Sequence, residues 1–348
     1  SREKMNMTAE MVMEIYNCDW CGDSGEYDAA IEDYPDSFYY LDNDDVVCDD
    51  CRYDAYSCYN CGTTGHCDNS CYCDNCCESY CDSCYYDSYE HSCSNSDGIH
   101  DYSYVPDELM FHGNQYPLDN PMPDLYMGVE LETQGEIGDA SALIDFVQRD
   151  DEEHAFLKDD SSISGVEIVT HPMTLDYHRN EYDWQGLIES AESDGFYDGT
   201  GAGLHVHISR DGLGNSRAEQ AQVETNVLAM LEIHWDKWVE LARRDSSHWA
   251  AKNLLGVSIN KKNLEDGKDY RKGRYQALNF TNPDTIEFRM FRSTMDVSVI
   301  QATLEGVYVM AFMAKYRSLE NILNTTFDDV LEQAAALNLH HLFDYYTS

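Results

Sequence analysis

Long hydrophobic runs are missing from this chain of 348 residues. No stretch approaches the ~18 consecutive apolar residues that a membrane-spanning helix needs. The first residues, SREKMNMTAE, also lack the apolar segment of a secretory signal peptide. These absences argue against a membrane protein and against export. They predict a cytoplasmic protein, located in the host cytoplasm or the virion if the chain is viral, and the length is enough for two domains.

Basic residues are scarce. The chain has 22 Lys and Arg against 66 Asp and Glu, which gives a formal net charge of −44. Such a surface repels nucleic acid, because nucleic-acid affinity rests on Lys and Arg contacts to phosphate. One explanation is adaptation to very high salt, where self-repulsion is screened, as in a halophilic organism or its virus. The alternative is an acidic protein that binds cations or a basic partner.

Cysteine is absent from the last 255 residues, and all 14 cysteines lie between Cys18 and Cys93. Five pairs have Cys-x-x-Cys spacing, namely Cys18/Cys21, Cys48/Cys51, Cys58/Cys61, Cys73/Cys76 and Cys81/Cys84. Two such pairs supply the four thiolates of a tetrahedral zinc site. A disulfide scaffold is the alternative, but disulfide frameworks belong mainly to secreted chains, so the spacing favours zinc.

The pairing of these cysteines is open. Cys18/Cys21 with Cys48/Cys51 is the simplest first site, and Cys58/Cys61 with either Cys81/Cys84 or Cys73/Cys76 is the second. Four cysteines and two histidines are left over, enough for a third ion: Cys67, Cys71, Cys77, Cys93, His66 and His91. Sites with four protein ligands have no open position, so these zinc ions are expected to be structural.

The cysteine-rich segment is itself strongly acidic. From Asp19 to Glu108 it carries 23 acidic residues and a single basic residue, Arg52. Zinc modules that bind DNA are normally basic. We therefore expect this module to contact a protein partner or to support the neighbouring domain.

Proline is also rare, and four of the seven prolines fall within residues 105–123. That stretch has no helical or strand periodicity and is expected to be a linker. The predicted organisation is a cysteine-rich zinc-binding domain at 1–104, the linker at 105–123 and a second domain at 124–348. Apolar residues spaced three and four apart predict helices over 216–245 and 297–320, with weaker patterns over 139–149 and 326–337.

Four segments of the second domain alternate apolar and charged residues, which is typical of half-buried strands. MGVELETQ (127–134) places Glu130 and Glu132 on one face, and GVEIVTHP (165–172) contains Glu167. GLHVHIS (203–209) places His205 and His207 together. In TIEFRMFR (285–292), strict alternation places Glu287, Arg289 and Phe291 on one face.

A single Glu-x-Glu on an outer sheet face is usually only solvated. Four strands that each carry such groups have the ligand types for two hard divalent cations, with arginine left for phosphate. A zinc hydrolase would also use His205 and His207, but it would have less use for so many carboxylates.

The same segments resemble a known family. GAGLHVHIS resembles the glycine-rich His-x-His strand of glutamine synthetase and related carboxylate–amine ligases, MGVELE their paired-glutamate strand and TIEFRMFRST their late Glu-x-Arg strand. With DDSSISGVEIVTHP between the first and second of these, the order is most similar to the amidoligases of phages and bacteria within that superfamily. The resemblance runs from about Tyr126 to Thr303 and implies an α+β fold, a curved antiparallel sheet with flanking helices.

The resemblance also implies a cleft with ATP and two Mg²⁺ or Mn²⁺ ions. Glu130 and Glu132 would each ligate one of the two ions. Glu167 would ligate the ion nearer the amine. His205 and Glu287 would ligate the ion nearer the nucleotide.

The phosphate contacts follow from the same resemblance. His207 would contact phosphate, and Arg289 would hold the transferring phosphoryl group. Arg292 or Arg274 would serve as a second cation.

Three further residues are implied to meet the substrates. Asp160 would bind the amine or a metal. Gly201 and Gly203 would allow the backbone to approach the substrate.

The sequence therefore predicts an ATP-dependent amidoligase that joins a small-molecule or peptide carboxylate to an amine through an acyl phosphate. The alternative is a non-catalytic interaction protein, such as a viral structural component that reuses a ligase fold.

Overall fold

The computed structural model describes residues 98–106, 109–113, 121–137, 140–149, 153–159, 162–245, 250–269, 271 and 273–348. Before residue 98 it describes eight short strands and Cys58. The chain divides into two compact units, Ser1–Asn95 and Ser96–Ser348.

The first unit contains four antiparallel hairpins. They are formed by β1 (Met13–Asn17) with β2 (Ser24–Asp28), β3 (Phe38–Tyr40) with β4 (Val46–Cys48), β5 (Ala55–Ser57) with β6 (Thr64–His66), and β7 (Ser70–Cys73) with β8 (Glu78–Cys81). Every predicted Cys-x-x-Cys pair starts at the last residue of one of these strands or at the residue after it. The starting residues are Cys18 after β1, Cys48 in β4, Cys58 after β5, Cys73 in β7 and Cys81 in β8.

Cys58 is buried. Of the other predicted zinc ligands, six lie outside the described residues: Cys18, Cys21, Cys51, Cys61, Cys76 and Cys84. Zinc binding therefore stays a prediction.

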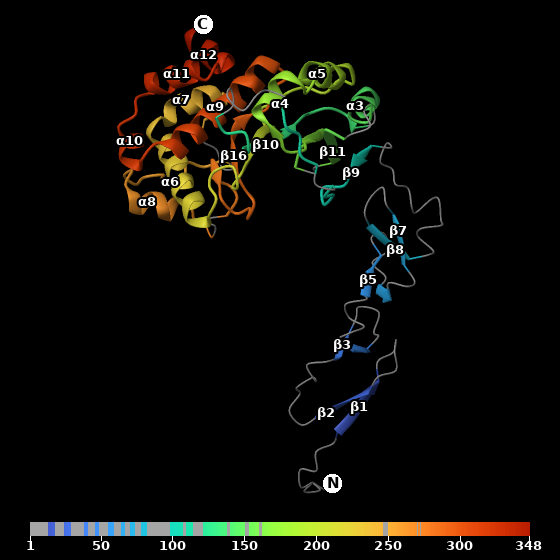
Figure 1. Ribbon diagram of the computed structural model, residues 1–348. Coiled ribbons are helices and arrows are strands. Elements are labelled where there is room, and N and C mark those ends of the chain that lie inside the picture. The colour runs from blue at the N-terminus through green and yellow to red at the C-terminus, as the bar shows by residue number, and fades with distance from the viewer. Residues whose placement is uncertain are drawn as a thin grey trace. The chain divides into compact units, whose positions relative to one another are not determined.

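The second unit is built on one open sheet flanked by helices (Figure 1). Its strand order is β15 (Leu278–Asn279), β16 (Thr285–Arg292), β14 (Gly203–Ser209), β10 (Tyr126–Glu132), β12 (Val166–Thr170), β11 (Ala155–Asp159) and β9 (Ile99–His100), with β13 (Met173–Thr174) paired to β10. Every pairing is antiparallel except that of β9 with β11. The α+β class is confirmed. The expectation of a purely antiparallel sheet is corrected at the β9 edge, where the sheet is mixed.

All four predicted helical segments contain a helix, but two of them are interrupted, at His234 and at Arg317, and four further helices among the described residues were not predicted. The helices of this unit are α3 (Ser141–Val147), α4 (Leu175–Asn180), α5 (Trp184–Ser193), α6 (Arg217–Ile233), α7 (Trp235–Ala242), α8 (Lys261–Gly267), α9 (Val297–Tyr316), α10 (Leu319–Leu323), α11 (Phe327–Ala336) and α12 (His340–Thr347). The single helix expected over 216–245 is two helices, because the backbone leaves helical geometry at His234 (φ −112°, ψ 26°). The Trp238 indole then donates a hydrogen bond to the free carbonyl of Met230 (3.1 Å) in the last turn of α6.

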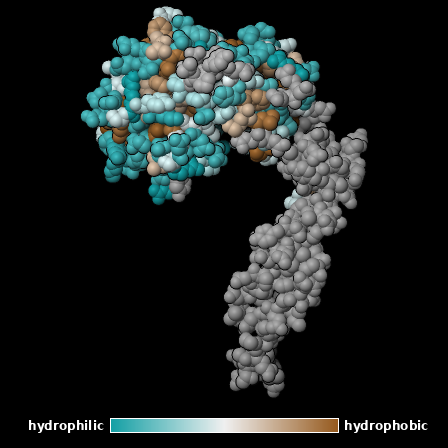
Figure 2. Space-filling view, viewed as in Figure 1, coloured by the Kyte–Doolittle hydropathy of each residue, from teal (hydrophilic) through white to brown (hydrophobic). Residues whose placement is uncertain are grey.

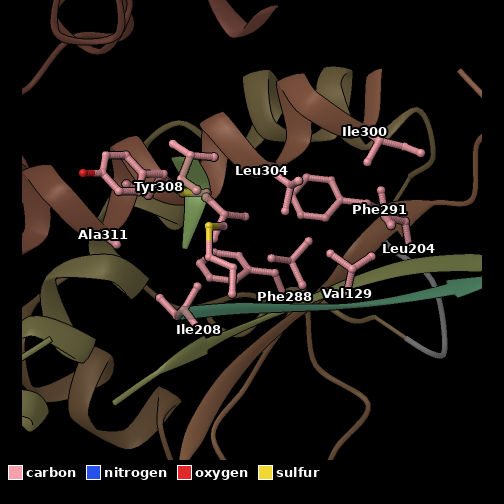
Figure 3. Packing of buried hydrophobic residues seen from close by; sticks show 14 of the residues in the cluster. Val129, Leu204, Ile208, Phe288, Phe291, Ile300, Leu304, Tyr308 and Ala311 are labelled. Atoms are coloured by element: carbon pink, nitrogen blue, oxygen red, sulfur yellow. The ribbon is translucent and has the colours of Figure 1, made fainter. Parts of the chain in front are cut away.

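Helix α9 packs across the apolar face of the sheet (Figure 3). Val129, Leu204, Ile208, Phe288 and Phe291 come from the strands, and Ile300, Leu304, Tyr308 and Ala311 from α9. All nine side chains are buried. The visible surface of this unit is mostly hydrophilic by contrast (Figure 2). The apolar half of each alternating strand is therefore the half that holds the unit together.

Among the described residues, α9 is the one helix long and apolar enough to cross a membrane. Of its most apolar stretch, 78% is buried inside the unit. A central core helix has the same composition, so this is weak evidence of a membrane span.

Phe291 departs from strict alternation. A β-bulge shifts the β14–β16 register between Leu204 and Val206, so that Arg289 and Met290 both lie opposite His205. Past the bulge the faces exchange, which places Phe291 in the core and Arg292 on the charged face. The expectation that Phe291 shares a face with Glu287 is wrong.

The boundary between the units differs from the expected one at residue 104. The division falls after Asn95, and β9 (Ile99–His100) belongs to the sheet of the second unit. Within the expected linker 105–123, Phe111 bridges to Met173, and Phe111 and Met122 are both buried. Burial of these apolar side chains ties the segment to the second unit.

Candidate functional site

The charged face of the sheet carries the predicted residues side by side. Glu130 lies directly opposite His205, and His207 directly opposite Glu287. Residues directly opposite on antiparallel strands share a face, with their Cβ atoms about 5 Å apart. The sheet register thus brings together side chains that are up to 157 positions apart in the chain, as Glu130 and Glu287 are.

Short distances join these groups into one cluster. His205 Nδ1 lies 3.1 Å from Glu130 Oε2 and 3.6 Å from Glu287 Oε1. His207 Nε2 lies 3.2 Å from Glu130 Oε1 and 3.8 Å from Glu287 Oε1. His205 Nε2 is 3.7 Å from Glu132 Oε1, which adds the second glutamate of β10. We name Glu130, Glu132, His205, His207 and Glu287 the acid–imidazole cluster.

Neighbouring side chains orient the cluster. Arg289 Nη1 donates a hydrogen bond to Glu287 Oε1, and Asn279 Nδ2 donates one to Glu287 Oε2 (2.7 Å). On β16, Thr285 Oγ1 lies 3.2 Å from His207 Nδ1. Both oxygens of Glu287 and both nitrogens of His207 therefore have neighbours, which limits the freedom of these side chains.

Glu130 and His207 form an ion pair. Burial opposes the charged form of His207, but the Glu130 and Glu287 carboxylates outweigh it and raise the pKa of His207 to about 9. Burial likewise opposes ionisation of Glu130, but His207 and His205 hold the pKa of Glu130 well below its usual range. Without a bound cation, the proton on His207 offsets part of the negative charge here.

Glycine is required at position 203. A Cβ there would lie 2.7 Å from His205 Nε2, so a side chain would displace the imidazole. The Gly203 backbone N–H also donates to Glu132 Oε2. Gly201, in the preceding loop, is exposed, and a Cβ there would meet only Gln134 Nε2 at 3.8 Å.

The remaining predicted residues do not all reach the charged face. Glu167 is 6% exposed and lies directly opposite Glu132, so it joins the charged face. Asp160 lies outside the described residues. The Arg274 guanidinium contacts Tyr102 Oη (3.3 Å) and Tyr275 Oη (3.4 Å). Within the described residues it makes no ion pair with the acid–imidazole cluster.

Arg292 lies directly opposite Gly203, at the end of β16. Close to it are two arginines that the sequence interpretation missed, Arg243 and Arg244. Arg244 donates hydrogen bonds to the carbonyls of Met290 (2.9 Å) and Arg289 (2.6 Å). Both arginines directly follow α7 in the chain. Nothing local in the sequence pointed to the sheet.

A cleft of about 1030 Å³ opens at the other end of the charged face. Glu130 and His207 line it, together with Tyr126 and Ser209 from the same two strands. Its apolar lining includes Val105, Pro106, Met110, Phe156, Val169 and Pro172. A volume near the upper end of the ~300–1000 Å³ range of ligand pockets is enough for a nucleotide.

The acid–imidazole cluster offers the donor atoms of a metal site. Glu130, His207 and Glu287 offer ligand atoms that all lie within 4.8 Å of one another, and His205 is within 3.6 Å of both carboxylates. Carboxylate oxygens with imidazole suit Mg²⁺ or Mn²⁺. The residues therefore fit a divalent cation, with His207 as a donor beside His205.

A second group, Glu305, His340 and His341, has similar spacing. There Arg179 already lies 3.3 Å from the Glu305 carboxylate and 3.1 Å from His340 Nδ1. A guanidinium in that position supplies the positive charge and disfavours a metal ion.

The chain matches no protein-family model, and no curated protein matches it.

Proposed function

We propose that the second unit is an ATP-dependent carboxylate–amine ligase. One observation carries the proposal: Glu130, His207 and Glu287 offer ligand atoms within 4.8 Å of one another beside a cleft of about 1030 Å³, with Arg289 bonded to Glu287. Phosphoryl transfer from ATP requires ligands for divalent cations, a positively charged group for phosphate and a cleft large enough for the nucleotide. The type of reaction, amide formation, comes from the resemblance of four strand segments to glutamine synthetase relatives.

The nucleotide is proposed to lie in the cleft. The base would rest against apolar side chains such as Met110, Phe156 and Val169, and the polyphosphate would point toward Glu130 and His207. Mg²⁺ or Mn²⁺, when held by the acid–imidazole cluster, would neutralise the polyphosphate.

The chain's own groups then serve two steps. A carboxylate oxygen of the substrate forms a bond to the γ-phosphorus while the bond to ADP breaks, and the Arg289 guanidinium stabilises the charge on the transferring group. The amine next attacks the acyl carbon, and inorganic phosphate leaves. Glu167, buried on the same face, accepts the proton that the amine loses.

The test is ADP release from Mg–ATP at high KCl, with pooled amino acids and peptides as carboxylates and amines. We expect wild type to release ADP only when both kinds of substrate are present. Glu287→Ala should be inactive, and the exposed Glu192→Ala should match wild type. Turnover of a peptide or ester without ATP would favour a hydrolase that uses His205 and His207.

A non-catalytic interaction protein is the other outcome of the same assay. It would give no ADP release from a folded wild-type protein over a wide range of salt, while partner binding survives Glu287→Ala.

We also propose that the first unit holds two or three structural zinc ions. The support is that each Cys-x-x-Cys pair begins at a strand end, where a short turn presents two thiolates to one ion. Metal analysis of the full chain should give two or three zinc ions, and Cys58→Ser should lose about one. Zinc content near zero in protein purified under reducing conditions would reject the proposal. The acidic composition of this segment favours a protein partner over nucleic acid.

A further inference from the structure

Four arginines gather at one end of the charged face, in a chain that has only 22 basic residues against 66 acidic ones. Arg289 and Arg292 lie on β16, and Arg243 and Arg244 directly follow α7. Burial and the charge of Arg292 lower the pKa of Arg243, although Tyr345, Asp198 and Asp296 oppose this shift. Burial and the charges of Arg289 and Arg243 lower that of Arg244, although the Glu132 carboxylate opposes this. The guanidinium groups are thus close enough to repel one another.

The backbone fixes this arrangement. The Arg289 N–H donates to the Ala277 carbonyl (2.9 Å), and beyond it the described residues before β15 no longer pair with the outer edge of β16. Arg244 donates to the carbonyls of Arg289 and Met290, and Arg243 donates to those of Arg292 and Ser293. Neutral carbonyls hold the guanidinium groups in place but do not cancel their charge.

Direct ion pairs are few around these arginines, and the carboxylates of Asp198, Asp296 and Glu132 act on Arg243 and Arg244 only without forming one. Arg289 pairs with Glu287. Within the part of the chain that the structure describes, no carboxylate forms an ion pair with Arg243, Arg244 or Arg292. The buried Nε atoms of Arg243 and Arg292 have no hydrogen-bond partner there either. In a chain with three acids per base, three guanidinium groups without a direct ion pair, gathered beside a carboxylate cluster, point to an anionic ligand.

The nucleotide is poorly placed to be that ligand. Gly203, opposite Arg292, and Ser209, which lines the cleft, lie at opposite ends of β14. Six residues of extended strand span roughly 20 Å. Phosphates that reach Glu287 and Arg289 from the cleft would leave Arg292 free.

We propose that Arg292, backed by Arg243 and Arg244, forms an oxyanion subsite for a second carboxylate of the substrate whose first carboxylate reacts beside Arg289. The role of this subsite in a reaction rests on the proposed ligase function. The substrate class is then a dicarboxylic acid or an acidic amino acid or peptide, and not a monocarboxylate.

Calorimetry on the full chain tests this without turnover. The probes are glutarate, pentanoate, inorganic phosphate and ADP, at constant ionic strength. The proteins are wild type, Arg292→Gln, Arg292→Lys and, as the control, the exposed Arg271→Gln. We expect glutarate to bind wild type and pentanoate to bind at least tenfold more weakly. Arg292→Gln should weaken glutarate binding roughly ten- to a hundredfold, as expected for a charged hydrogen bond. Arg292→Lys should restore part of the affinity, and Arg271→Gln should match wild type.

The outcomes separate the two proposals. Glutarate binding that depends on Arg292 without any ADP release would keep the subsite and reject the ligase. If Arg292→Gln weakens ADP or phosphate binding and leaves glutarate unchanged, the subsite serves the nucleotide and the substrate assignment is wrong. Equal binding of glutarate and pentanoate, or no binding of either, would overturn the subsite. An unchanged unfolding midpoint for Arg292→Gln would show that its loss of binding is not caused by a folding defect.

Discussion

Cation binding at the acid–imidazole cluster should be coupled to loss of a proton from His207. His207 Nε2 lies 3.2 Å from Glu130 and 3.8 Å from Glu287, the two carboxylates with which it would share a cation. Despite its burial, these carboxylates raise the pKa of His207 to about 9, so the imidazole is protonated at neutral pH. A metal ligand must be the neutral imidazole, so binding has to displace that proton.

The size of the effect follows from the pKa. Two pH units below it, proton competition weakens the apparent affinity about a hundredfold relative to the neutral imidazole. As the pH rises from 7 toward 9 the proton is progressively lost, so the apparent affinity for Mg²⁺ should rise about tenfold per pH unit and level off above pH 9. The assay is calorimetry of Mg²⁺ binding in pairs of buffers with different ionisation enthalpies, which also counts the protons released. We expect about one proton per ion at pH 7.

His207→Gln is the matched test. It should bind Mg²⁺ with little dependence on pH over this range, whereas the exposed His112→Gln should behave as wild type. An affinity for Mg²⁺ that is independent of pH in the wild-type protein would refute the reasoning. So would a pH dependence that survives in His207→Gln.

Three other predictions concern single buried positions. His178 is fully buried, and burial lowers its pKa to about 4 despite a backbone hydrogen bond that opposes the shift. Above pH 6.5 neither the folded nor the unfolded state holds this proton, whereas between pH 6.5 and about 4 only the unfolded state does. This group should therefore lower the free energy of unfolding by about 2 kcal/mol between pH 7 and pH 5. Urea unfolding should show that His178→Gln lacks this loss. An equal loss in the variant would contradict the prediction. Gly203→Ala should displace the His205 imidazole and weaken Mg²⁺ binding about tenfold, whereas Gly201→Ala should leave it unchanged. Equal effects of the two substitutions would show that the close contact between Gly203 and His205 does not matter for the cation. Phe291→Ala should lower the free energy of unfolding by about 3–5 kcal/mol, and a loss below about 1 kcal/mol would place Phe291 on the charged face.

Much of the charged face could be predicted because strand alternation is a local property. Glu130, Glu132, His205, His207 and Glu287 each stand in a segment whose apolar neighbours must be buried, so their common orientation follows from the period of two. The sequence could not supply the register, which is fixed by non-local pairing. Only the structure places His207 opposite Glu287 and within reach of Glu130.

The features that sequence reasoning missed depend on such non-local pairing. The β-bulge at Arg289 and Met290 turns Phe291 inward, and its cause lies in the pairing with β14. The break at His234 interrupts a helical pattern that continues unchanged in the sequence. Arg243 and Arg244 reach the sheet through the carbonyls of β16, and no local pattern indicates that contact.

The most direct test of the ligase proposal follows an oxygen atom. The wild-type protein is incubated with Mg–ATP, carboxylic acids labelled with ¹⁸O in the carboxylate, including glutarate, and hydroxylamine as a general amine. Inorganic phosphate is then analysed by mass spectrometry. An acyl phosphate transfers one carboxylate oxygen to phosphate, so we expect one ¹⁸O per phosphate and a matching amount of hydroxamate, with neither formed by Glu287→Ala. Release of unlabelled phosphate by wild type would mean that water, not a carboxylate, attacks the nucleotide, and would contradict the proposed ligase.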